Sequence, residues 1–81
     1  MRETAWRIDF TEYERGWGSK PDGFTLYATK ELADAAFKAH WDAYPDGEAP
    51  DYYIHASHPR KVDLTVQQSR TMGDLNSCPF A

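Results

Sequence analysis

With 81 residues and a net charge of −4, the chain has room for one folded domain and little electrostatic attraction for nucleic acid. Its one cysteine, Cys78, excludes a disulfide within the chain and favours a reducing compartment. Neither the opening MRETAWRIDF nor any later apolar run has the length of a signal peptide or a membrane span, so the sequence predicts a cytoplasmic protein with no membrane partner.

Aromatic side chains dominate the apolar part of the composition. Three Trp, five Tyr and four Phe residues outnumber the eight Leu, Ile and Val residues. A domain of this size cannot bury every ring, and clustered surface aromatics are typical of interfaces and ligand pockets. We therefore expect some of these aromatic side chains to contact a partner.

A first strand is expected over residues 5–13, AWRIDFTEY, where alternation with period two places Trp6, Ile8 and Phe10 on one face. Residues 23–28, GFTLYA, form the expected second strand, with its apolar side chains turned to the same core. The preceding Lys20-Pro21-Asp22-Gly23 has the composition of a turn. A hairpin with a long, glycine-containing loop is predicted.

A helix is expected over residues 30–44, KELADAAFKAHWDAY, with Thr29 as its N-cap and Glu31 in its first turn. Its alanine-rich stripe fits close packing on a sheet. A second, bulky stripe that includes Trp41 and Tyr44 is broader than a small sheet needs, so it is predicted to reach a partner.

Two further strands are expected over residues 51–56 and 61–66, joined by a turn at Ser57-His58-Pro59-Arg60. Residues 67–81 carry little apolar content and are predicted to be a loosely ordered C-terminal tail. The domain itself is assigned to residues 1–66.

The predicted fold class is α+β, a small antiparallel sheet of about four strands (ββαββ) with one helix packed on one face. A right-handed crossover through the helix gives the strand order 2-1-3-4. One core is expected between helix and sheet, formed by Trp6, Ile8, Phe10, Phe24, Leu26, Leu32, Ala36, Ile54 and Leu64.

Catalytic and metal-binding motifs are weak in this sequence. No Ser or Cys nucleophile stands in a recognisable setting, and no glycine loop fits a phosphate. His55 and His58 have the spacing H-x-x-H, with His40 on the helix, but a metal site needs three or four convergent ligands. The sequence therefore predicts a non-enzyme without cofactor or metal, and a minor metal-dependent enzyme built on His55 and His58 is the alternative.

An acidic stretch follows the helix, formed by Asp42, Asp46, Glu48 and Asp51. It lacks the D-x-D-x-D-G pattern and closing Glu of a calcium loop. It is interpreted as a solvated loop or as a negatively charged patch that meets a basic partner.

The loop Arg15-Gly16-Trp17-Gly18-Ser19-Lys20 is the main candidate binding site. Trp17 lies between two glycines, where no neighbouring side chain shields its indole, and Arg15 and Lys20 supply local positive charge. An exposed Trp beside Arg is typical of a binding hot spot. The other interpretation, left open, is that Trp17 folds back and covers the small core.

A second group of candidate binding residues lies near the end of the helix. Trp41, Tyr44, Tyr52 and Tyr53 supply more aromatic surface than the core can absorb. Self-association through this patch is predicted, with a symmetric homodimer as the expected form.

The block ERGWGSKPDGFTLYATKELADAAFKAHWDAYPDGEAPDYY, residues 14–53, resembles a family of short uncharacterised proteins encoded by bacteriophages and prophages, which share a GWG-x-x-P-DG loop. The resemblance implies a small accessory protein that acts on its host by stoichiometric binding. An inhibitor of a host defence complex, such as an anti-CRISPR or other anti-defence protein, is therefore the expected function. A protein that sequesters a nucleotide signal, with Trp17 stacking on the base, is the alternative.

Overall fold

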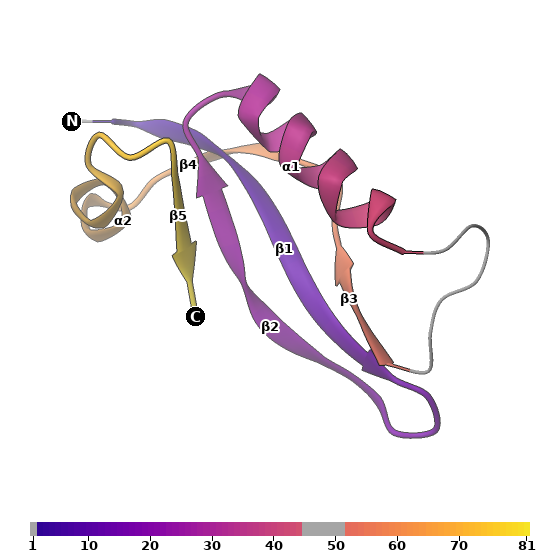
Figure 1. The fold of residues 1–81 in the computed structure, drawn as a ribbon. Helices are drawn as coiled ribbons and strands as arrows, with labels where there is room; N and C mark the ends of the chain where they lie inside the picture. The colour runs from indigo at the N-terminus through magenta and orange to yellow at the C-terminus, as the bar shows by residue number, and fades with distance from the viewer. Residues whose placement is uncertain (1, 45–51) are drawn as a thin grey trace.

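The computed structural model describes residues 2–44 and 52–81, and within them the chain forms an antiparallel sheet with two helices (Figure 1). In chain order the elements are β1 (Thr4–Glu14), β2 (Gly18–Tyr27), α1 (Lys30–Asp42), β3 (Tyr52–Ala56), β4 (Arg60–Asp63), α2 (Val66–Met72) and β5 (Ser77–Phe80). The predicted α+β class with a small antiparallel sheet is confirmed. The sheet has five strands, and the described chain contains a second helix that was not expected.

The sheet is built on β1. One edge of this strand pairs with β2, and the other pairs with β3 along residues 10–14 and with β4 along residues 4–7. β5 extends the sheet by pairing with β2. The predicted order 2-1-3 is therefore right for the first three strands, but β4 lies beside β1 and not beyond β3.

The segment between β3 and β4 does not turn the chain, contrary to the prediction. Both strands run antiparallel to β1, so the chain continues in one direction from β3 into β4. From Phe10 to Arg7 the chain of β1 advances by three residues. The segment that pairs with it, from Ala56 to Arg60, advances by four and therefore contains one extra residue. The Ser57 N–H donates to the Asp9 carbonyl oxygen at 2.9 Å. The segment is thus a bulge in an otherwise continuous edge strand.

The β1–β2 hairpin has a shorter turn and longer arms than predicted. Its turn is closed by the Trp17 N–H, which donates to the Glu14 carbonyl oxygen at 2.9 Å, and Gly16 adopts a φ of 85°. A positive φ at the third residue is what a type II turn requires. The strands continue up to Glu14 and Gly18, so the hairpin extends as a narrow arm beyond α1 (Figure 1).

Residues 20–23, predicted as the turn, lie inside β2, where residues 21–23 form a bulge opposite the register shift between Asp9 and Thr11 of β1. Gly23 has a φ of 81°, and a Cβ at this position would collide with the Phe80 carbonyl oxygen of β5. Glycine is therefore required both by the backbone conformation and by the close approach of the C-terminal strand.

Two hydrophobic clusters lie on opposite faces of the sheet, where the sequence predicted one core. Under α1, the buried residues Ile8, Ala33 and Ala56 pack with Trp6, Phe10, Tyr27, Ala36, Phe37 and Trp41. On the other face, the buried residues Ala5, Leu26, Met72 and Cys78 pack with Phe24, Ala28, Val62, Leu64 and Phe80.

The single-core prediction is wrong because β2 presents Leu26 to the other face. Leu26 pairs with Arg7, and successive residues of a strand point to opposite faces, so Leu26 cannot share the face of Ile8. Leu64 packs with Leu26. Leu32, also assigned to the core, is 37% exposed.

The C-terminal residues are ordered, which corrects the prediction of a loose tail. Thr65 begins α2 with a capping box: its hydroxyl accepts from the Gln68 N–H, and the Gln68 side chain accepts from the Thr65 N–H. Met72 of α2 and Cys78 of β5 are both buried beneath the sheet face opposite α1. These two side chains anchor a segment whose overall composition is polar.

Side chains from the last turn of α1 and from the residues just after it cover the outer edge of β3. The Tyr44 hydroxyl accepts from the Ile54 N–H at 3.0 Å, and His40 Nε2 lies 2.6 Å from the Ile54 carbonyl oxygen. Trp41 Nε1–H donates to the Ala56 carbonyl oxygen at 3.3 Å. These groups take the place of a neighbouring strand, which is one way that proteins protect an exposed edge.

We expect Leu26→Ala to lower the free energy of unfolding by about 2–5 kcal/mol, because Leu26 is 1% exposed at the centre of its cluster. Urea denaturation followed by far-UV circular dichroism measures this loss. An unchanged midpoint would show that the α2–β5 side of the sheet contributes little to stability.

We expect Tyr44→Phe to cost about 1–3 kcal/mol, because the Ile54 N–H loses its acceptor at the sheet edge. Tyr52→Phe is the matched control, since Tyr52 is 53% exposed and should change stability by no more than about 0.5 kcal/mol. Equal free energies of unfolding for the two variants would contradict the role of Tyr44 as an acceptor at the edge of β3.

Candidate functional site

Trp17 is the most exposed large apolar side chain at the tip of the hairpin, with 83% of its surface accessible. The interpretation in which it folds back over the core is therefore wrong. Gly18, which follows it, has a φ of 90°, and a Cβ on either flanking glycine would meet no atom within 4 Å. The turn thus presents the indole on a narrow support with open space around it.

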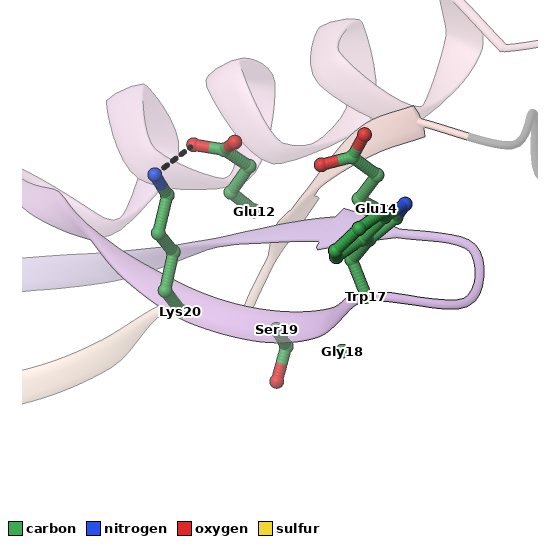
Figure 2. A pocket seen from close by; sticks show the side chains of 6 residues that line it. All are labelled: Glu12, Glu14, Trp17, Gly18, Ser19 and Lys20. Carbon is green, nitrogen blue, oxygen red and sulfur yellow. Dashed lines mark ion pairs between the residues drawn. The ribbon is translucent and has the colours of Figure 1, made fainter.

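A shallow hollow of about 160 Å³ lies beside Trp17 and is lined by Glu12, Glu14, Trp17, Gly18, Ser19 and Lys20. Trp17 and the two glutamates project from one side of the hairpin, and Ser19 projects from the other (Figure 2). Lys20 Nζ lies 3.8 Å from a Glu12 carboxylate oxygen, on the neighbouring strand. The lining therefore carries two carboxylates against one ammonium group, next to an exposed aromatic ring.

Tyr52 borders this acidic side of the hairpin, since it pairs with Glu14 across the β1–β3 ladder. The pKa of the Tyr52 hydroxyl is raised above its ordinary value, first by loss of solvation and then by the negative charges of Glu12 and Asp22. The carboxylates near Tyr52 thus add to the effect of lost solvation on its hydroxyl. Arg15 lies exposed in the turn itself.

Three of the four predicted aromatic contact residues make contacts within the chain. Trp41 and Tyr44 direct polar atoms to β3, and Tyr53 stacks on Tyr13 with ring centroids 5.3 Å apart. Tyr52 is the one member of this group that is more than half exposed. The bulky stripe of α1 therefore serves the edge of the sheet, and the predicted homodimer stays a prediction.

Two glutamates of the hollow and Tyr13 were not among the predicted site residues. Glu12 and Glu14 lie near the end of β1, and the hairpin register brings them beside Trp17 and Lys20. Tyr13 meets Tyr53 because the two residues pair directly across β1 and β3. In both cases the contact depends on which residues pair across the strands. Alternation along one strand does not give this cross-strand register.

The three histidines differ in the residues that they contact. His58 packs against Phe37 with centroids 4.6 Å apart, His55 packs against Trp41, and His40 faces Ile54. Within residues 2–44 and 52–81, no group of three or more His, Cys, Asp or Glu side chains is arranged to hold a metal ion.

Of the predicted acidic patch, only Asp42 belongs to the described residues, and it forms an ion pair with Lys38 at 2.6 Å. Asp46, Glu48 and Asp51 lie outside the described residues. The acidic groups that the structure places beside Trp17 are those of β1 instead.

Comparison with protein-family models, with curated proteins and with solved structures finds no match to this chain. Neither helix of the described part of the chain is long and apolar enough to cross a membrane. The resemblance to phage-encoded proteins stays a prediction.

We expect Glu12→Gln to lower the pKa of Tyr52 towards its ordinary value of 10.0, because the substitution removes one of the negative charges that disfavour ionisation of the hydroxyl. A titration of ¹³C-labelled tyrosine by NMR resolves this residue from the other four. Asp34→Asn, on α1, removes the same charge elsewhere and should leave the Tyr52 titration unchanged. A Tyr52 pKa that falls equally in both variants would contradict a local effect of Glu12.

Proposed function

We propose that this protein acts without chemistry of its own, by stoichiometric binding of a protein partner through the tip of the β1–β2 hairpin. Following the resemblance to phage-encoded proteins, the partner is a host defence complex in the bacterial cytoplasm and the outcome is inhibition. The observation that carries the binding proposal is the exposure of Trp17, 83% accessible at the end of a hydrogen-bonded arm.

An exposed Trp on an ordered turn favours binding for two reasons. Its large apolar surface gains free energy when a partner covers it, and the turn limits the conformational entropy lost on binding. Trp is also enriched among the few residues that dominate interface energetics. The glycines at positions 16 and 18 keep neighbouring side chains from obstructing the approach.

The charges beside Trp17 favour a basic partner surface. Glu12 and Glu14 line the hollow, and one of them is only loosely neutralised by Lys20 at 3.8 Å. A partner that brings Lys or Arg side chains would place them against these carboxylates and over the indole face. Nucleic-acid-binding complexes carry such basic surfaces, which agrees with the proposed target class.

Sequestration of a nucleotide signal receives less support from the same site. Trp17 offers a stacking surface for a base, but the phosphate groups of a nucleotide would approach the Glu12 and Glu14 carboxylates. Calorimetric titration with cyclic dinucleotides tests this alternative directly, and saturable binding that Trp17→Ala abolishes would favour it over a protein partner.

The binding proposal is tested with Trp17→Ala. We expect this substitution to change the free energy of unfolding by no more than about 0.5 kcal/mol and to weaken partner binding by about 2 kcal/mol or more, roughly thirtyfold. The partner is captured from bacterial lysate on immobilised protein, identified, purified and then used for affinity measurements. Thermal melting of the same samples separates lost affinity from lost folding.

Leu75→Ala provides a matched control, since Leu75 is 54% exposed in the loop that precedes β5. This variant should bind the purified partner as the original chain does. If Trp17→Ala retains full affinity while folded, the hairpin tip is not the binding surface.

A further inference from the structure

A second candidate site lies where β1 begins, at the opposite end of this strand from the hairpin tip. Two adjoining hollows share the lining residues Arg2 and Ser69. The first, of about 480 Å³, is completed by Arg70, Gly73 and Asp74. The second, of about 350 Å³, is completed by Glu3, Leu64, Thr65 and Val66. Arg2 and Ser69 therefore stand between a polar hollow and one of mixed lining, in which Leu64 and Val66 lie beside Glu3 and Thr65.

Two enclosed polar atoms at this boundary have no hydrogen-bond partner among residues 2–44 and 52–81, namely Arg2 Nε and Ser69 Oγ. Ser69 is only 6% exposed and is the one buried polar residue that the described chain contains. Enclosed donors without acceptors are rare in folded proteins, because each loses its interaction with solvent and gains nothing in return. Their presence in one place indicates that an acceptor group belongs there.

Few hydrogen bonds within the described chain use the side chains of Arg2 and Ser69. The guanidinium of Arg2 is held by one long hydrogen bond, from Nη2 to the Gly73 carbonyl oxygen at 3.5 Å. Within α2, Ser69 bonds to Thr65 through its backbone N–H, so no bond within the helix uses its hydroxyl.

The charged side chains that line the polar hollow indicate what kind of acceptor fits there. Arg70, in the last turn of α2, adds a second guanidinium to that of Arg2, and Asp74 is the single carboxylate in this lining. Guanidinium groups pair with planar or tetrahedral oxyanions through two parallel hydrogen bonds. Val66, 61% exposed, and Leu64 offer apolar contact on the other side of Arg2.

We propose that Arg2, Ser69 and Arg70 bind an oxyanion, the carboxylate or phosphate group of a ligand whose remaining part lies along Leu64 and Val66. Arg2 Nε and the Ser69 hydroxyl donate to the oxyanion, and Arg70 adds charge at the open side. This site shares no residue with the hairpin tip, so it does not depend on the function proposed for Trp17.

The test uses the full chain, with sodium phosphate and sodium octanoate as separate probes at constant ionic strength. The Arg2 Nε–H signal and the Gly73 amide are followed by ¹H–¹⁵N NMR. We expect saturable shifts with a dissociation constant on the order of 1 mM, as a few charge-assisted hydrogen bonds can support. Saturation by phosphate identifies a phosphate group as the ligand, and saturation by octanoate identifies a carboxylate on an apolar chain.

Arg2→Gln and Ser69→Ala should each weaken the saturating probe at least tenfold, whereas Lys38→Gln, which removes a positive charge from α1, should leave binding unchanged. If neither probe saturates on the original chain, the proposal is wrong whatever the variants do. It is equally overturned if all three variants bind alike, because the shifts then report general ionic effects. Should Arg2→Gln or Ser69→Ala unfold, the Arg2 Nε–H titration of the original chain still decides the outcome.

Discussion

The backbone hydrogen bonds of β1 determine the arrangement of almost everything else in the molecule. β2 occupies one edge of this strand, and β3 and β4 share the other edge end to end. An extended strand of 11 residues is longer than an α-helix of 13 residues, so α1 shields only part of one face. α2 and β5 supply the second cluster on the opposite face. Both clusters end before Glu12 on β1, and the uncovered remainder of the strand forms the arm that presents Trp17.

The edge of β3 explains why the aromatic side chains of α1 do not form a free surface. An unpaired strand edge carries backbone donors and acceptors that invite pairing with another chain. Polar atoms of His40, Trp41 and Tyr44 satisfy these groups. The Trp41 ring also packs against Tyr53 and His55. The bulky stripe on α1, which is broader than a small sheet needs, is thus explained because its side chains cover the edge of β3 as well as the face of the sheet.

Local patterns predicted β1, β2, α1, β3 and β4 but neither α2 nor β5, and strand register decided how these elements pair. Alternation found β1, and the Thr29 hydroxyl accepts from the Leu32 N–H as the predicted N-cap of α1. Two bulges, at residues 21–23 and 57–59, resemble turns in composition because both need residues that leave regular strand geometry. Composition cannot tell a bulge from a turn, since only the partner strand shows whether pairing resumes in the same direction.

The absence of long-range pairing from local patterns also explains why the predictions of a single core and of a loose C-terminal tail were wrong. Which face Leu26 occupies depends on its pairing with Arg7, a contact between residues far apart in sequence. In the C-terminal segment, Met72, Cys78 and Phe80 pack in the second cluster, and three such side chains are too few to show as apolar periodicity. Trp17 and Lys20 could be identified from the sequence because they lie three residues apart in one hairpin. Glu12 and Glu14 required the hairpin register, and the Arg2–Ser69 pair required the docking of α2 near the start of β1.

The two candidate sites sit beyond opposite ends of β1, and the strand between them is a continuous paired element. Binding at one site changes the affinity of the other only if an element between them has two arrangements and both ligands shift the equilibrium between these arrangements. β1 is paired along both edges and enclosed by a cluster on each face, so sliding it by one residue would reverse the side chains of both clusters at once. The sheet therefore behaves as a fixed spacer. Occupancy at Arg2 and Ser69 should leave the affinity at Trp17 unchanged, which makes each site separable from the other by substitution.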